Sequence, residues 1–178
     1  RGGTVVIPAF AVGRTQDLMF HIHTLKQANR IPDLPVFLDS PMAINATEVY
    51  RNHPEDFDED MQARMRSGHS PLEWRRLRVT RTVAESKAIN AEAGPVLIIS
   101  ASGMLAGGRV LHHLKTMIED PRNTILFTGY QAMGTRGRAM KTGEQKIKIH
   151  GEYYAVKARI ESLENLSAHA DSDDLVNW

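Results

Sequence analysis

Short runs rich in Val, Ile, Leu and Phe alternate with helical patterns along this chain, and this alternation constrains its fold more than any other feature. The runs occupy residues 4–10, 36–39, 77–81, 95–100 and 123–128, and each has the length and composition of a buried strand. Between them, apolar residues recur at helical spacing, as at residues 14–29 and 107–119. The pattern predicts an α/β fold with a mostly parallel, Rossmann-like sheet covered by helices on both faces.

Local signals support this organisation, and two segments depart from it. Ser40 precedes Pro41 at a predicted helix start, and Thr82 precedes a predicted helix over residues 83–91, so both are expected N-caps. Residues 53–74 lack a strong apolar period, which predicts a helical excursion or lid. Residues 145–161 alternate as paired strands do, which predicts a C-terminal β-hairpin.

Composition excludes several classes of protein. The 178 residues contain no cysteine, which removes disulfides, thiolate zinc sites and cysteine nucleophiles. Lys and Arg number 22 against 21 Asp and Glu, for a net charge of +1, and this balance argues against a histone-like polycation. The longest apolar stretches are too short to span a bilayer, and no signal peptide opens the chain. We therefore expect a cytoplasmic protein with no membrane partner.

Small and hydrogen-bonding residues follow four of the predicted strands. Ligands of parallel α/β sheets bind at this carboxyl edge, where helix N-termini and glycines let an anion approach the backbone. Arginine adds forked donors for phosphate, and Arg109 and Arg138 also lie in these segments. The candidate substrate-binding residues at this edge are Arg14, Asp39, Ser40, Ser102, Gly103, Gly129, Tyr130 and Arg136.

Any one of these loops alone is explained better by helix capping, but four at one edge, with arginines, favour a phosphate-rich ligand. The chain has neither a P-loop nor a complete dinucleotide-binding pattern. Basic residues also exceed acidic ones between residues 134 and 160. That excess fits either a nucleic-acid backbone or a solvated hairpin face.

The eight histidines do not combine into a zinc site by spacing. His21 and His23 are two residues apart on a predicted helix, so their rings diverge, and the adjacent His112 and His113 cannot grip one ion together. His169 differs, because it lies in a loop between Ser167 and Asp171, just before a predicted helix. It is either an oriented acid–base group or a histidine near a helix cap.

Five segments, in this order, resemble those of the β-CASP domain of metallo-β-lactamase-fold nucleases. They are IPAFAVGRTQDL at 7–18, LDSPMA at 38–43, ISASGM at 99–104, GYQAMGT at 129–135 and LSAHAD at 166–171. The blocks span nearly the whole chain, and the nearest branch is the bacterial and archaeal RNA-processing nucleases related to the cleavage and polyadenylation nuclease. The resemblance implies that RNA is the substrate.

The resemblance also implies a two-domain enzyme, in which a metallo-β-lactamase domain holds two zinc ions and the β-CASP domain caps its cleft. In the family, the histidine of the last block faces the scissile phosphate, and this catalytic role carries over to His169, with Ser167 beside it in substrate binding. The family's His-x-His-x-Asp-His zinc motif is absent from this sequence. We therefore expect residues 1–178 to be a β-CASP domain excised from a larger chain, without zinc and inactive alone.

The partners expected on this reading are RNA and the protein's own metallo-β-lactamase domain, with a homodimer possible because related enzymes commonly dimerise. Two other functions stay open. One is a nucleotide- or phosphometabolite-binding α/β module without any nuclease connection. The other is an interaction domain that binds a protein partner through residues 53–81.

Overall fold

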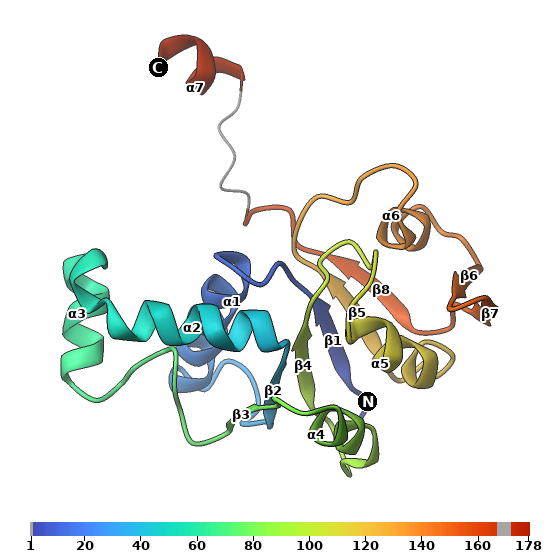
Figure 1. The fold of residues 1–178 in the computed structure, drawn as a ribbon, viewed down its shortest axis with the longest axis horizontal. Helices are drawn as coiled ribbons and strands as arrows, with labels where there is room; N and C mark the ends of the chain where they lie inside the picture. Colours follow the sequence, from blue (N-terminus) through green and yellow to red (C-terminus); the bar gives the residue numbers. More distant parts are fainter. Residues whose placement is uncertain (1, 167–171) are drawn as a thin grey trace.

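The computed structural model describes residues 2–166 and 172–178, and its centre is one parallel sheet (Figure 1). The strand order is β3 (Leu77–Val79), β2 (Val36–Asp39), β4 (Leu97–Ser100), β1 (Val5–Pro8), β5 (Thr124–Phe127) and β8 (Arg159–Ser162). Every pair of neighbours is parallel. The α/β prediction is thus confirmed, and four of the five strands are two or three residues shorter than the corresponding apolar runs.

Helices cover both faces of the sheet. The helical elements are α1 (Arg14–Gln27), α2 (Pro41–Asn52), η1 (Pro54–Asp56), α3 (Glu59–Arg66), α4 (Val83–Ala88), η2 (Ile89–Ala91), α5 (Val110–Met117), α6 (Arg136–Lys141) and α7 (Ser172–Asn177). Both predicted caps are confirmed, since Ser40 Oγ accepts a hydrogen bond from the Ala43 amide and Thr82 forms a capping box with Glu85. In the described part of the chain, every helix is too short or too polar to cross a bilayer.

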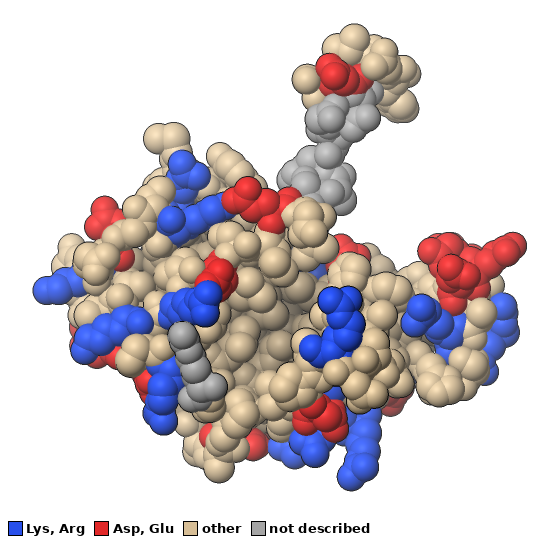
Figure 2. Space-filling model, turned by 180° about the vertical axis from the view of Figure 1, so that it is seen from behind, with Lys and Arg blue, Asp and Glu red and all other residues tan. Residues whose placement is uncertain are grey.

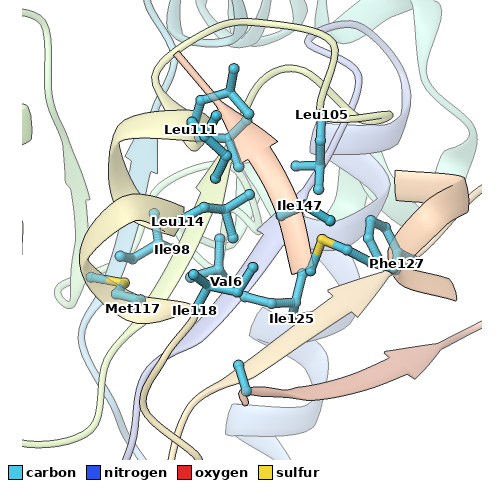
Figure 3. Close-up of a cluster of buried hydrophobic side chains, with 14 of the residues drawn as sticks. Val6, Ile98, Leu105, Leu111, Leu114, Met117, Ile118, Ile125, Phe127 and Ile147 are labelled. Carbon is cyan, nitrogen blue, oxygen red and sulfur yellow. The ribbon is translucent and has the colours of Figure 1, made fainter. Parts of the chain in front are cut away.

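Successive residues of each central strand enter two separate cores, because side chains alternate across a strand. Ile7 and Ile99 pack under α1, α2 and α3 on one face. Val6 and Ile98 pack on the other face, where Figure 3 shows Leu111 and Leu114 of α5 above them. A strand that is apolar on both faces is typical of a sheet buried between two helical layers.

The segment over residues 53–74 is helical in part and anchored to the body. It contains η1 and α3, and its Met61 and Leu72 are buried in the core beneath α1. Apolar packing of these two residues therefore holds the segment against the rest of the structure.

The predicted hairpin is confirmed but is shorter than residues 145–161. It consists of β6 (Lys146–Ile149) and β7 (Glu152–Ala155), which pair antiparallel. The last part of the predicted segment is β8, which joins the edge of the main sheet beside β5. The hairpin packs on the α5 face, where Ile147 and Ile149 are buried.

Strands β1 and β4 are neighbours whose following helices lie on opposite faces. α1 follows β1 on one face, and α5 follows β4 on the other. The two loops therefore diverge and leave a crevice at the carboxyl ends of the strands. Such a topological switch point is where open α/β sheets bind their ligands.

Candidate functional site

A cavity of about 380 Å³ lies at this switch point, formed by the loops that follow β1, β4 and β5. We call it the switch-point cavity. Four of the candidate residues line it, namely Arg14, Gly103, Gly129 and Tyr130. A second cavity of about 270 Å³ shares Arg14, Gly129 and Tyr130 and extends to Lys141 on α6. The structure thus brings half of the eight predicted strand-edge residues into one place.

The loop after β1 is shaped by two local contacts. Gly13, the N-cap of α1, adopts a φ of 75°, which glycine tolerates and other residues rarely do. The Thr15 hydroxyl donates a hydrogen bond of 2.7 Å to the Phe10 carbonyl. A Cβ on Gly103 would lie 3.2 Å from the Phe10 ring, so this glycine allows the loops after β1 and β4 to approach closely.

Three residues that line the switch-point cavity each have a buried polar atom without a hydrogen-bond partner in the structure. The atoms are Arg14 Nη1, Thr128 Oγ1 and Gln131 Oε1. Leaving a buried donor unpaired costs free energy, and the guanidinium and hydroxyl are both donors suited to a phosphate oxygen. The cavity therefore has free hydrogen-bonding capacity for an anion.

Exposed aromatic and apolar side chains surround these donors. Phe10 is 51% exposed and Tyr130 is 66% exposed, and both line the cavity. Aromatic rings at this position offer faces on which bases can stack. The site thus combines donors for a phosphate with stacking surfaces, as single-stranded nucleic-acid binding requires.

The other strand-edge candidates stabilise loops and do not line the switch-point cavity. Ser40 caps α2, and Ser102 Oγ accepts a hydrogen bond from the Ala106 amide. Arg136 donates to the carbonyls of Leu105, Ala106 and Lys148. Its guanidinium joins the loop after β4 to the hairpin, where we had expected it to face a ligand.

Asp39 is likewise displaced from its expected role, because its carboxylate is completely buried. Oδ1 accepts hydrogen bonds from Thr80 at 2.6 Å and from Arg109 at 2.9 Å. Oδ2 accepts from Ser86 at 2.6 Å and lies 2.7 Å from His113 Nε2. We call these five residues the Asp39 cluster, and its hydrogen bonds leave Asp39 no exposed oxygen for a ligand.

Two residues of the Asp39 cluster come from a distant part of the chain. Arg109 precedes α5, His113 lies within it, and both reach across to the end of β2. Arg109 also donates to the carbonyls of Thr80 and Arg81, so it is not the free phosphate donor that its position suggested. Burial alone would raise the pKa of Asp39, but the hydrogen bonds from His113, Ser86, Thr80 and Arg109 hold that pKa well below its ordinary value.

We expect the contribution of Asp39 to the free energy of unfolding to be lost in acid. Its pKa in the folded state lies below the ordinary value of 3.8, so the unfolded chain takes up the proton first as the pH falls. The contribution is complete above about pH 5 and decreases below about pH 4. Urea denaturation of the wild type and of Asp39→Asn at about pH 6 and pH 3 checks this. The difference in free energy of unfolding between the two proteins should be smaller at pH 3 than at pH 6. An equal difference at both pH values would contradict the prediction.

The histidines lie as their spacing predicted. His23 is buried with its ring centroid 5.4 Å from that of Trp74, whereas His21 is exposed. Within the described residues, one group of three potential metal ligands lies close together, His53, Glu55 and Asp56, and all three are exposed. Exposed groups of this kind are common without a metal, so we assign no zinc centre to them.

The basic excess between residues 134 and 160 is partly neutralised in the structure. Lys141 pairs with Glu164 at 2.6 Å, and Arg159 pairs with Glu161. Figure 2 shows basic and acidic side chains interspersed over the face seen from behind. This arrangement is closer to a solvated surface than to an unbroken basic track.

Two candidate residues, Ser167 and His169, lie outside the described residues, so their roles stay predictions. Conversely, the structure adds Thr128 and Gln131 to the site. Both were visible in the sequence, Thr128 at the end of the last apolar run and Gln131 within the GYQAMGT block. Neither was selected, because an uncharged side chain at a strand end is common in any α/β protein.

The fold is an α/β sheet with a cavity at its carboxyl edge, lined by the loops after β1, β4 and β5. The family model for the Beta-Casp domain matches residues 15–140, and the model for the Zn-dependent metallo-hydrolase RNA specificity domain matches residues 153–178. The chain belongs to the β-CASP family. The resemblance to RNA-processing nucleases is thereby confirmed.

Several relatives are similar to this chain over essentially its whole length. A ribonuclease of Thermus thermophilus is 39% identical over 178 residues, and an RNase J-like protein of Methanocaldococcus jannaschii is 32% identical over 177 residues. The transcription termination factor FttA of Methanosarcina mazei is 34% identical over 184 residues. The chain spans 41%, 40% and 29% of the lengths of these three relatives.

Proposed function

We propose that this chain is the RNA-gripping domain of a larger zinc-dependent ribonuclease, and that the switch-point cavity holds an RNA phosphate. In this proposal a metallo-β-lactamase domain elsewhere in the parent protein holds two zinc ions and cleaves the phosphodiester bond. His169 serves that reaction as a charge-stabilising or proton-donating group. In this proposal residues 1–178 are inactive alone, because their sequence lacks the family's His-x-His-x-Asp-His motif.

One observation carries the RNA part of the proposal: free donors and exposed rings occur together in one cavity. Arg14 Nη1 and Thr128 Oγ1 lack partners, and Phe10 and Tyr130 expose their rings beside them. A phosphate oxygen would satisfy the donors, and the adjacent base would stack on a ring. The relatives named as ribonucleases support the same class of substrate.

A nucleotide- or phosphometabolite-binding module uses the same donors, so the two functions must be separated by experiment. A mononucleotide satisfies the phosphate contact but occupies only one base position. RNA also contacts further positive charges along its backbone, which makes its affinity steeply dependent on salt. Affinity for RNA that exceeds affinity for a mononucleotide and falls with salt therefore supports the proposal.

We expect Arg14→Ala to weaken binding of single-stranded RNA of every sequence. The slope of the logarithm of the affinity against the logarithm of the salt concentration should decrease by about one. The reason is that Arg14 contacts a phosphate and reads no base. Filter binding with an oligoribonucleotide of about 16 nucleotides at several salt concentrations measures both quantities. Arg30→Ala is the matched control, because Arg30 is exposed just beyond the other end of α1. Equal effects of the two substitutions would contradict the assignment of Arg14.

A further inference from the structure

A separate cavity of about 320 Å³ lies between α1, α2 and α3, on the α1 face of the sheet. It has no role in the proposed function, and its lining differs in chemistry from the switch-point cavity. Three aromatic rings line it, those of Phe20, Tyr50 and Phe57. Its volume lies at the lower end of the range for small-molecule sites.

The charged groups around this α1–α2–α3 cavity are mainly acidic. Asp17, Asp58 and Asp60 line it, against one cation, Arg64. The Arg64 guanidinium carbon lies 5.4 Å from the centroid of the Phe20 ring, so this cation already has an aromatic partner. Figure 2 shows acidic side chains grouped above basic ones at the end of the molecule where α3 lies. The cavity therefore favours a positively charged occupant.

A buried acceptor in the cavity points to the same kind of ligand. Gln16 lines the cavity and is 4% exposed. Its Nε2 donates to the Ala11 carbonyl at 3.2 Å and to Thr47 Oγ1 at 2.9 Å, which fixes the orientation of the amide. Its Oε1 is buried and has no hydrogen-bond partner, so Gln16 brings an unpaired acceptor to the cavity lining.

The aromatic rings supply the remaining element of cation recognition. Tyr50 and Phe57 have ring centroids 6.0 Å apart at an angle of 45°. Aromatic rings in a cavity lining can offer π-faces to a cation, and a desolvated cation gains the most from such contacts. Rings, carboxylates and a free amide oxygen all favour an ammonium or guanidinium group and disfavour an anion.

We propose that the α1–α2–α3 cavity is a second ligand site, which binds a small organic cation with an apolar body. The cationic group would donate hydrogen bonds to Gln16 Oε1 and the aspartates, and the body would pack on Tyr50 and Phe57. The site differs from the phosphate site, because Asp58 and Asp60, which disfavour a phosphate, line this cavity and not the switch-point cavity. Asp17 lines both cavities, so it is left unchanged in the test.

The test uses the chain of 178 residues, with benzylammonium as the probe and benzyl alcohol as its uncharged counterpart. We expect saturable binding of benzylammonium by NMR titration, with shifts at the Gln16 side-chain amide and the Tyr50 ring. Benzyl alcohol should bind at least about threefold more weakly, because it lacks the charge. Equal binding of the two probes, or no saturable shift, would overturn the proposal.

Asp60→Asn should lower the affinity for benzylammonium at least about threefold, because the substitution removes one carboxylate from the cavity lining. Glu59→Gln is the matched control, since Glu59 is the exposed neighbour of Asp60 in the first turn of α3 and does not line the cavity. Equal losses in both variants would count against the site. If Asp60→Asn disturbs α3, the wild-type protein still decides the matter, because the comparison of the two probes needs no substitution.

Discussion

Asp39→Ala is expected to lower the free energy of unfolding by about 3–5 kcal/mol. The substitution removes the acceptor of four buried hydrogen bonds, and it leaves the Arg109 guanidinium without its carboxylate in a site where that side chain is 18% exposed. It also leaves Ser86 Oγ and His113 Nε2 buried without this partner. Urea denaturation followed by circular dichroism measures the loss.

Two variants separate charge from packing in this experiment. Asp39→Asn keeps the shape and removes the charge, so we expect a smaller loss than with alanine. Asp56→Ala removes an exposed carboxylate in η1 and should change the stability by no more than about 0.5 kcal/mol. A loss below about 1 kcal/mol for Asp39→Ala would show that the Asp39 cluster does not hold β2 to α5.

Gly108→Ala is expected to destabilise the fold by at least about 2 kcal/mol, through its backbone. Gly108 has a φ of +79°, and a Cβ there would lie 2.3 Å from the Ala101 carbonyl oxygen. The backbone of the loop after β4 would have to move to admit the methyl group. That loop carries Gly103 of the switch-point cavity, so the affinity for RNA should fall with the stability.

The adjacent glycine provides the control for this prediction. Gly107 has no atom within 4 Å of a Cβ position and no positive φ. Gly107→Ala should therefore leave the midpoint of urea denaturation nearly unchanged. Equal midpoints for the two alanine variants would mean that the loop accommodates the methyl group at Gly108 without strain.

Much of the fold could be predicted from local sequence, because buried parallel strands and capped helices carry local signals. The five apolar runs became β1 to β5, and Ser40 and Thr82 cap helices as their types suggest. The position of β8 could not be predicted in this way. Its alternating charged residues fit an edge strand of a large sheet as well as one strand of a hairpin. The structure shows that β8 pairs with β5, and local sequence carries no signal for that distant pairing.

The sequence predicted where the candidate site lies more accurately than it predicted which residues line it. Strand ends identified the edge, and Arg14, Gly103, Gly129 and Tyr130 do meet there. Asp39 follows the same rule at the end of β2 but is enclosed by Arg109 and His113, which lie some seventy residues later in the chain. A polar residue at a strand end faces either a ligand or a distant helix, and local sequence does not distinguish the two.

The order of the strands has a consequence for how the chain is made. β1 is synthesised first, yet both of its neighbours come much later, since Val5 pairs with Leu97 and Thr124. At about 5–20 residues per second, β1 waits about 5–20 seconds for its first partner. During that time a nascent apolar segment has unpaired edges open to aggregation. We therefore expect that β1 is a binding site for chaperones during translation, and that ribosome-bound chains ending before β4 are not yet protected from proteases.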